Sequence, residues 1–547
     1  MRLGNRKDFI GLFLILLSGW VLTYQIANRL DIVPTDDDVY FKNGLTATWQ
    51  NLPPVQMAPL FSLWYRIIQF FTGDILQTYY VSWALLSILP GILFYVLLRS
   101  LRVGLFSSVW LAVFFLFCEL NFPLQPKVSV FSMLWLMGGL IWANRSDKPV
   151  TKLMVTAGGA LLAAYARPEF YLAFLLLTGV AVVYWLWQRR RNGTKTAFPR
   201  VGAYVAGAGL LLAVTLGSPM QSSRSHIAFG QHFAMNYAVW HPEIDASPWM
   251  HSSVFIKHGF GRDITSLGDA FFLNPALFMR HITTNVVNLG RLTANYSRDM
   301  LADPWLKLLE FPGRRYLLLA LAVAFVALTN WRATFGRIGR GLLRDGAYWF
   351  CLGAVLLPTF ISTILIFPRE HYVIFHALLY ISLAGVLLRD WVFRPLPVLS
   401  RPAVHWGLNA LLLALFLVPL FRESSRPKPT PLVDNVLFFR SMGITQPVNL
   451  FSNEPMMYEL YLTPDWHFFY QGQYKPANLG PFLTQQKINM VHVRPDMAET
   501  YARDPYFVQL TQQPASLGYV KKPAPQPGQY VLIRQDLLPL IHSTNSD

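Results

Sequence analysis

Charge is the property that this sequence has least of. Only 14% of its 547 residues are Asp, Glu, Lys or Arg, whereas 53% are hydrophobic. A soluble globular chain carries about 25% charged residues, so the composition excludes an ordinary soluble enzyme. Several apolar runs approach the ~20 residues that a helix needs to cross a bilayer. The sequence therefore predicts a polytopic α-helical membrane protein.

Cysteine is almost absent as well. Cys118 and Cys351 are the two cysteines, and both lie inside apolar runs. No disulfide framework is implied, so any extracytoplasmic domain must fold without one. The N-terminal stretch MRLGNRKDFIGLFLILLSGWVL has the positive start and apolar run of a signal peptide, but no small-residue cleavage site follows it. We expect an uncleaved first span.

Eleven spans are expected, at residues 9–28, 78–98, 103–120, 128–144, 152–166, 169–187, 201–217, 316–331, 346–367, 371–388 and 403–420. With the N-terminus inside, the cytoplasmic connections hold 20 of the 46 Lys and Arg residues, and each short outward turn holds only one. This bias predicts a cytoplasmic N-terminus and an extracytoplasmic C-terminus. Much of the net charge of +17 is therefore explained by the orientation of the spans in the membrane, and it does not indicate nucleic-acid binding.

Three larger segments are expected outside. They are residues 29–77, residues 218–315 and a tail from about residue 421. The first two contain amphipathic stretches typical of short helices on the membrane surface, such as PLFSLWYRIIQFF and AFGQHFAMNYAVWH. The expected division is a transmembrane domain over 1–420 and an extracytoplasmic domain over 421–547.

The tail has a different composition from the rest. After the Pro-rich link SSRPKPTPL, strand patterns (VNLFS, INMVHV, YVLIR) alternate with a helix expected near EPMMYELYL. About 120 residues with this alternation predict a small α/β domain.

Three adjacent carboxylates stand out in PTDDDVYF, directly after the first span. Asp36, Asp37 and Asp38 could cap a solvated helix, since Asp is favoured at helix N-termini. Adjacent like charges raise one another's pKa unless something balances them, however. Such a cluster also suits a general base for an acceptor group, or oxygen ligands for a cation such as Mg²⁺ or Mn²⁺.

The surroundings of these carboxylates resemble a known family. The motif consists of two Asp residues, two further residues and an aromatic. It fits either Asp36–Asp37 with Tyr40 or Asp37–Asp38 with Phe41, and the Pro-containing stretch MAPLFSLWY follows it. This pattern resembles the first outward loop of GT-C membrane glycosyltransferases, of the protein O-mannosyltransferase and lipid A aminoarabinose transferase type. Those enzymes have Asp-Glu or Asp-Asp there, and this chain has Asp at the second position.

The resemblance implies an activity. A hexosyl or pentosyl group would pass, with inversion, from a polyprenyl-phosphate donor to a lipid, glycan or protein acceptor, and no nucleotide would be used. One Asp of the motif would be the base, at the outer face of a membrane. The near absence of cysteine and the compact loops point to a bacterial inner membrane with a periplasmic active face, as part of the cell envelope.

A leaving lipid phosphate needs cations at the outer rim. Arg369, Lys127 and Arg167 stand singly at outer span ends and are the first candidates, and Arg66 on a surface helix is a fourth. The alternative for each is a side chain that extends to the lipid headgroups. The turn FPREHYVIF partly resembles an aromatic-Pro-x-Arg-Tyr-like turn of the same enzymes. The expected sugar and acceptor neighbourhood is Tyr40, Glu169, Glu370, His371 and Tyr372.

Other functions remain open. The segment 218–315 holds six histidines, but none of the recurrent short zinc-ligand spacings appears, so we expect lid residues rather than a metal site. A transporter or flippase of lipid-linked sugars would favour internal repeats, which are not visible. A non-catalytic envelope assembly protein would leave the Asp cluster dispensable. A polymerase or ligase would differ by its diphosphate donor.

Overall fold

The computed structural model describes residues 6–540 except 34–35, 126, 193–197, 222–223, 302–315, 317–322, 324–325, 393–401, 445, 456–457, 463–464 and 475. Its contacts divide the chain into two compact units. The helical unit comprises Met1–Tyr24, Thr46–Trp64 and Trp83–Glu423. The sheet unit comprises Gln25–Leu45, Tyr65–Ser82 and Ser424–Asp547. Each unit is described separately.

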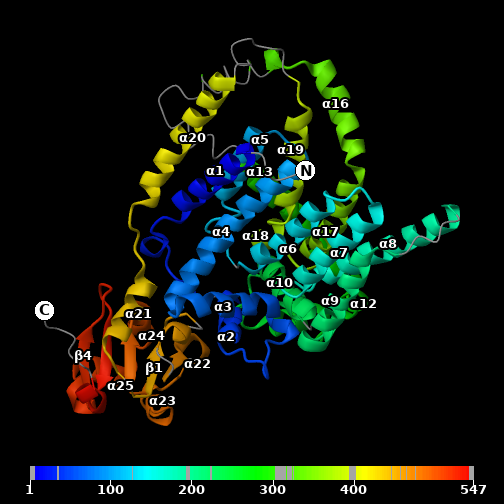
Figure 1. Ribbon diagram of the computed structural model, residues 1–547. Helices are drawn as coiled ribbons and strands as arrows, with labels where there is room; N and C mark the ends of the chain where they lie inside the picture. The colour runs from blue at the N-terminus through cyan, green and yellow to red at the C-terminus, as the bar shows by residue number, and fades with distance from the viewer. Residues whose placement is uncertain are drawn as a thin grey trace. The chain divides into compact units, whose positions relative to one another are not determined.

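Apolar helices dominate the helical unit (Figure 1). They are α1 (Arg6–Thr23), α4 (Ile75–Ser100), α5 (Leu105–Leu116), α6 (Val128–Ala143), α7 (Pro149–Ala164), α8 (Phe170–Asn192), α9 (Arg200–Leu216), α17 (Gly346–Leu365), α19 (His376–Asp390) and α20 (Pro402–Ser424). Among the described residues, five helical segments are long and apolar enough to cross a membrane, and four shorter helices are also apolar. A helix suits the bilayer because it pairs its own backbone groups. The predicted polytopic fold class is confirmed, while the expected span 316–331 lies largely outside the described residues.

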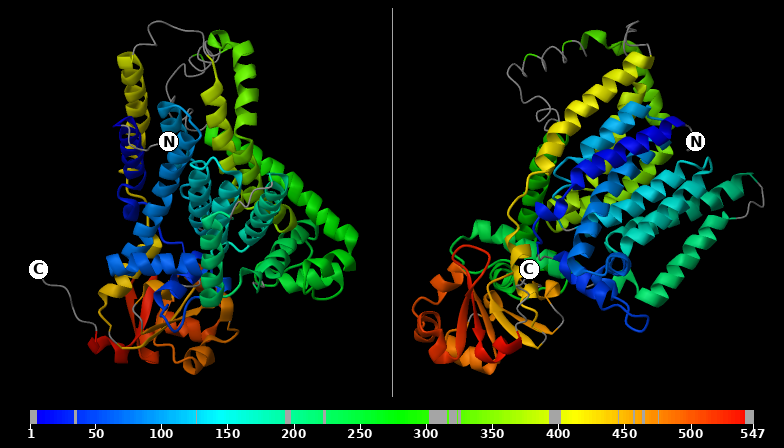
Figure 2. Two further views of the ribbon diagram at one scale, coloured as in Figure 1. Left: turned by 45° about the vertical axis from the view of Figure 1, so that its right-hand side comes forward. Right: turned by 60° about the vertical axis from the view of Figure 1, so that its left-hand side comes forward.

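Consecutive apolar helices pack closely. α6 contacts α7 and α7 contacts α8 along the chain (Figure 2). A Cβ built on Gly159 of α7 would lie 3.1 Å from the Cα of Gly139 of α6 and 2.7 Å from the carbonyl oxygen of Trp135. The two backbones therefore touch where glycine faces glycine, a packing mode common between membrane helices.

The large segment between α9 and α17 is also helical where it is described. It contains α10 (Arg224–Trp240), α11 (Ser252–Phe260), α12 (Leu267–Leu273), α13 (Pro275–Leu301) and α16 (Trp331–Arg344), and the one-turn α18 (Glu370–Val373) precedes α19. Phenylalanines of α10, α11 and α13 form one buried cluster. The predicted surface helices of this segment are confirmed as helices.

The tail folds around a five-stranded sheet. Its strands are β1 (Val448–Ser452), β2 (Trp466–Tyr470), β3 (Met490–Val493), β4 (Tyr519–Pro523) and β5 (Tyr530–Arg534), in the order β2-β1-β3-β5-β4. β1 is parallel to β2 and β3, and β5 is antiparallel to β3 and β4. Helices α21 (Pro431–Ser441), α22 (Gln471–Tyr474), α23 (Leu479–Gln485), α24 (Pro495–Thr500) and α25 (Pro505–Gln512) complete it. The small α/β domain is thus confirmed.

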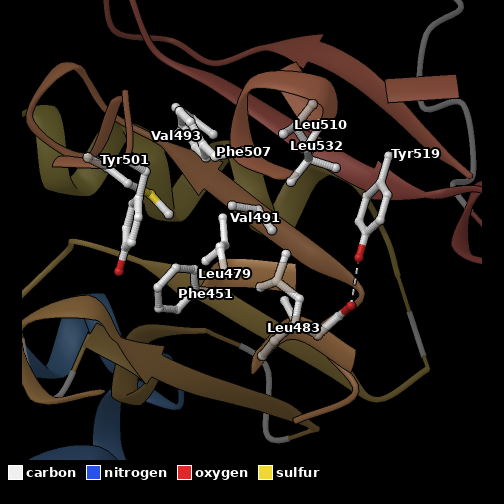
Figure 3. Packing of buried hydrophobic residues seen from close by; sticks show 12 residues of the cluster. Phe451, Leu479, Leu483, Val491, Val493, Tyr501, Phe507, Leu510, Tyr519 and Leu532 are labelled. Atoms are coloured by element: carbon white, nitrogen blue, oxygen red, sulfur yellow. Dashed lines mark hydrogen bonds between the residues drawn. The ribbon is translucent and has the colours of Figure 1, made fainter. Parts of the chain in front are cut away.

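One hydrophobic cluster of this domain lies on one face of the sheet. Phe451, Val491 and Leu532 come from three neighbouring strands and pack against Leu483 and Phe507 of the helices (Figure 3). The apolar residues of β1, β3 and β5 are buried because these strands occupy the middle of the sheet. The helix expected near EPMMYELYL is in the described part only the short 3₁₀ helix η4 (Tyr458–Tyr461).

Parts of the first outward segment fold with the tail. Helix α2 (Asp36–Leu45) and the C-terminal half of α3 (Pro59–Thr72) belong to the sheet unit. The Asp31 carboxylate accepts hydrogen bonds from the backbone N–H groups of Leu432 and Val433, at 2.9 and 3.0 Å. These bonds satisfy free N–H groups at the N-terminus of α21 with a negative charge, which the helix dipole favours.

Candidate functional site

The carboxylates singled out in the sequence are mostly interior groups. α2 begins at Asp36, so all three Asp residues lie in its first turn. Asp37 is 3% exposed and Asp38 is 1% exposed. The solvated-loop alternative is therefore wrong for these two residues, while the side chain of Asp36 is outside the described part.

Aromatic residues enclose this pair within the sheet unit. The phenol of Tyr461, from η4, donates a hydrogen bond of 2.7 Å to Oδ1 of Asp38. Phe41 stacks on Tyr65 with ring centroids 4.5 Å apart, and Tyr79 meets Tyr461 edge to face at 6.0 Å. We call Asp37, Asp38, Tyr65, Tyr79 and Tyr461 the acidic pocket. Tyr40, predicted beside it, is also buried.

The electrostatics of the acidic pocket follow from this enclosure. Burial, and then the charges of Asp37 and Asp38, raise the pKa of Tyr65 well above its ordinary value. Burial and the neighbouring Asp38 raise the pKa of Tyr461 in the same way. The phenols therefore stay protonated and serve as fixed hydrogen-bond donors. A carboxylate held in such surroundings can orient a hydroxyl or accept its proton.

Metal binding at the acidic pocket stays a prediction. Among the described side chains, no three His, Cys, Asp or Glu residues come together as metal ligands. Mg²⁺ typically takes only one or two carboxylates from the protein, however, with substrate phosphates and water supplying its other ligands. The carboxylates of the acidic pocket therefore suit either a proton-transfer role or a cation such as Mg²⁺ or Mn²⁺.

Two of the predicted cations lie on one series of aromatic contacts in the helical unit. The Arg167 guanidinium lies over the ring of Tyr372 at 4.4 Å and forms an ion pair of 2.7 Å with Glu169. Arg369 lies over the ring of Trp249 at 4.9 Å. His232 lies between these two arginine–aromatic pairs, since its ring centroid is 5.4 Å from that of Trp249 and 6.5 Å from that of Tyr372. We call these residues the arginine cluster: Arg167, Glu169, His232, Trp249, Arg369 and Tyr372.

The arginine cluster keeps its positive charge on the guanidinium groups. Burial, together with the nearby Arg369 charge, lowers the pKa of His232 to about 4, so this histidine is neutral at pH 7. Arg167 is 9% exposed, which makes it an interior group rather than a headgroup anchor. Of the neighbouring predicted residues, His371 is buried with its ring 4.3 Å from that of Tyr372, and Glu370 is exposed at the start of α18.

Lys127 is fully buried. Its ammonium lies 4.0 Å above the ring of Trp83 and donates to the backbone carbonyl of Asn121 at 2.6 Å and to Ser87 Oγ at 3.4 Å. Extension to lipid headgroups is therefore excluded for Lys127. Arg66 behaves oppositely, because its side chain is exposed and donates only to the carbonyl of Leu45, at 3.2 Å.

Comparison with known proteins gives a distant likeness. No protein-family model matches the chain, and no curated protein matches it. Among solved structures, the chain is similar to the crystal structure of ArnT from Cupriavidus metallidurans bound to undecaprenyl phosphate. The identity is 12%, the match covers 96% of this chain and 97% of that one, and the TM-score is 0.47. At this score the likeness carries no statement about ligand or activity.

Several residues of both clusters escaped the sequence analysis. Tyr461 lies 423 positions from Asp38, and no spacing rule joins them. His232 and Trp249 stood among many interfacial aromatics and histidines. Tyr65 had a usable signal, because it ends the MAPLFSLWY stretch that the motif already included.

Proposed function

We propose that this protein is a GT-C type membrane glycosyltransferase. It would move a sugar from a polyprenyl-phosphate donor to a lipid, glycan or protein acceptor, at the outer face of a bacterial inner membrane. The observation that carries the proposal is the buried pair Asp37 and Asp38, with a tyrosine hydroxyl fixed on one of its oxygens. Burying two adjacent carboxylates destabilises a fold unless hydrogen bonds or opposite charges compensate them, and such costly groups concentrate at functional sites.

The reaction assigns a role to each group. An acceptor hydroxyl attacks the anomeric carbon, and its proton passes to a carboxylate of the acidic pocket. The bond between the anomeric carbon and the phosphate oxygen breaks, and its electron pair leaves with the polyprenyl phosphate. Attack from the side opposite the leaving group inverts the anomeric centre.

The cations of the helical unit suit the leaving group. Arg369 and Arg167 offer planar donors that match a phosphate in bidentate fashion, and Lys127 offers a point charge. Aromatic rings beneath the two guanidiniums hold them in place by cation–π attraction. Glu169, which pairs with Arg167, and Tyr372 would set the position of the sugar.

The decisive experiment follows sugar transfer by the purified full-length protein from a radiolabelled polyprenyl-phosphate sugar. Asp37→Asn and Asp38→Asn remove one charge each at nearly constant volume. We expect at least one of them to lower kcat by roughly 10²–10⁴-fold, the range for a lost general base. Asp245→Asn, at an exposed carboxylate, is the matched control and should keep full activity.

The phosphate role has its own signature. Arg369→Ala should raise KM for the donor, and Arg369→Lys should restore it only in part, because lysine cannot make the bidentate contact. Treatment with EDTA and readdition of Mg²⁺ or Mn²⁺ tests the alternative that the carboxylates hold a cation. If folded Asp37→Asn and Asp38→Asn proteins both transfer sugar at the wild-type rate, the proposal is wrong. A flippase would move the donor intact, without releasing polyprenyl phosphate.

A further inference from the structure

The helical unit contains a cavity that none of the residues of the acidic pocket or the arginine cluster lines. Its volume is about 730 Å³. It is bounded by the C-terminal end of α4, the connection between α6 and α7, and the junction of α16 with α17. All three wall elements contain connections predicted to be cytoplasmic, whereas the acidic pocket and the arginine cluster come from segments predicted to face outward.

The walls of this cavity are strongly basic. Two acidic residues, Asp147 and Asp345, face five basic ones, which gives a net charge of +3. The basic residues are Arg99, Arg102, Arg145, Lys152 and Arg344.

Only part of this positive charge is balanced by the protein. Arg99 forms an ion pair of 2.9 Å with Asp8, and Arg344 lies 3.6 Å from Asp345. Within the described part of the chain, Arg102, Arg145 and Lys152 form no ion pair. Three like charges around one cavity repel one another, and an anion between them would relieve the repulsion.

A buried network holds the walls in place. Arg389, whose side chain is 8% exposed, donates to Asp345 at 2.7 Å and to the carbonyl of Leu101 at 2.8 Å. Asn144 donates to Ser100 Oγ at 2.9 Å, which joins the end of α6 to the end of α4. These contacts join the wall elements to one another, while the side chains of Arg102, Arg145 and Arg344 are exposed to solvent.

Arg102 lies just after the end of α4. Its φ is +64°, in the left-handed region that residues with a Cβ rarely adopt. The N–H of Val103 donates to the carbonyl of Leu98 at 3.0 Å, which is the hydrogen bond of a common helix C-cap. This backbone conformation therefore ends the helix and places Arg102 in the cavity wall, where glycine would fit without strain.

Membrane topology explains why these connections are basic, but it does not require their cations to converge on one cavity. We propose that this cavity, which is formed by connections predicted to be cytoplasmic, binds a phosphate group. The phosphate could belong to an anionic lipid headgroup or to a small soluble phosphate compound, since arginine and lysine recognise both in the same way. None of the residues assigned to sugar transfer lines this cavity, so the inference stands or falls independently of the proposed function.

The test uses the full-length protein and two probes. The first is radiolabelled orthophosphate in equilibrium dialysis against detergent-purified protein. The second is the Tm in nanodiscs of phosphatidylcholine alone, compared with nanodiscs that contain phosphatidylglycerol. The double variant Arg145→Gln, Lys152→Gln removes two wall cations. Lys148→Gln, in the same connection but outside the cavity wall, is the matched control.

One supporting result is that the double variant binds orthophosphate roughly tenfold or more weakly than the wild type while Lys148→Gln binds it normally. That result would identify a soluble phosphate ligand. Alternatively, phosphatidylglycerol raises the Tm of the wild type and of Lys148→Gln but not that of the double variant. That result would identify a lipid headgroup as the ligand. If neither probe has an effect, or if both variants respond like the wild type, the basic residues serve topology alone and the proposal is wrong.

One further variant separates binding from folding. Arg102→Gly removes a wall cation and also relieves the left-handed backbone strain, so its Tm without ligand should equal or exceed that of the wild type. Its response to the effective probe should nevertheless decrease. A purely structural role for Arg102 would make both quantities change in the same direction.

Discussion

At the scale of single residues, the hydrogen bond from Tyr461 to Asp38 is the contact that most shapes the acidic pocket. Both side chains are buried, so the carboxylate has little access to water. Tyr461→Phe should therefore destabilise the protein by about 1.5–3 kcal/mol, the cost of a hydrogen bond to a charged group. The measurement is the free energy of unfolding by denaturant, followed in detergent.

Tyr458→Phe is the control for this prediction. Its hydroxyl donates to the carbonyl of Leu432 at 3.3 Å, a longer bond to a neutral acceptor. Its loss should cost only about 0.5–1.5 kcal/mol. Equal effects of the two variants would contradict the special importance given to Asp38.

A second residue-scale prediction concerns pH. Burial lowers the pKa of His492 in β3 to about 4. The ring is therefore neutral at pH 7, and its distance of 3.6 Å from Glu454 is not an ion pair there. Nε2 of His492 lies 3.1 Å from the side-chain amide oxygen of Gln529. An amide oxygen can only accept a hydrogen bond, so the neutral ring carries its proton on Nε2.

The sign of the pH dependence follows from this shift. Between about pH 6.5 and 4 the unfolded chain binds a proton that folded His492 does not, so stability decreases as the pH falls through this window. The loss should reach roughly 2 kcal/mol at pH 5, and Glu454 offsets part of it because burial raises its pKa. Hydrogen exchange of the β3 amides at pH 7 and 5, corrected for intrinsic rates, measures the loss. His492→Asn should abolish most of it, and an unchanged loss would exclude His492 as the cause.

The sequence could identify residues by chemical type but not by partner. Asp37 and Asp38 were visible because three carboxylates are conspicuous in an apolar chain. Their burial was not visible, because Tyr461 is brought to them by folding of the distant tail. Arg167 and Arg369 were likewise found as isolated cations, whereas the aromatic contacts that link them depend on His232 and Trp249 of the large outward segment.

At the scale of elements, the contact between α6 and α7 depends on glycine. Gly159→Ala would place a methyl group 2.7 Å from a backbone oxygen, which cannot move as a side-chain end can. We expect a loss of about 1–3 kcal/mol from overpacking, measured as a decrease in Tm in detergent. Gly138→Ala is the matched control, because a Cβ there meets no atom within 4 Å. A Tm decrease in the control as large as in Gly159→Ala would show that helix packing is not the cause.

Elements were predictable where the hydrophobic pattern is continuous. The apolar helices stand out by their long hydrophobic runs, and strands β1, β3 and β5 stand out because most of their residues are buried. Strands β2 (WHFFY) and β4 (YVKKP) were missed. They are the two edge strands of the sheet, and most of their residues are partly or fully exposed. An edge strand carries little hydrophobic signal, since one side has no neighbour to pack against.

At the scale of the whole molecule, the chain order and the structural units do not coincide. Residues 25–45 and 65–82 cluster with residues 424–547, although more than 300 positions separate them. A sequence divides most naturally into consecutive domains, so this arrangement was not predictable. Asp31 connects the first outward segment to the tail within this unit, because its carboxylate accepts hydrogen bonds from two N–H groups at the start of α21.

The importance of Asp31 leads to a final prediction. Asp31→Ala removes the carboxylate that holds the start of α21 and should destabilise the sheet unit by about 1–3 kcal/mol. Local opening should then expose residues 25–45 and 424–440 together, so limited proteolysis should cleave both regions faster than in the wild type. Arg534→Ala is the control, since its ion pair with Asp536 is exposed and contributes little. Faster cleavage of only one region would show that the first outward segment and the tail open separately. In that case the tail would not stabilise the acidic pocket, and the function of the tail would depend on its own sheet.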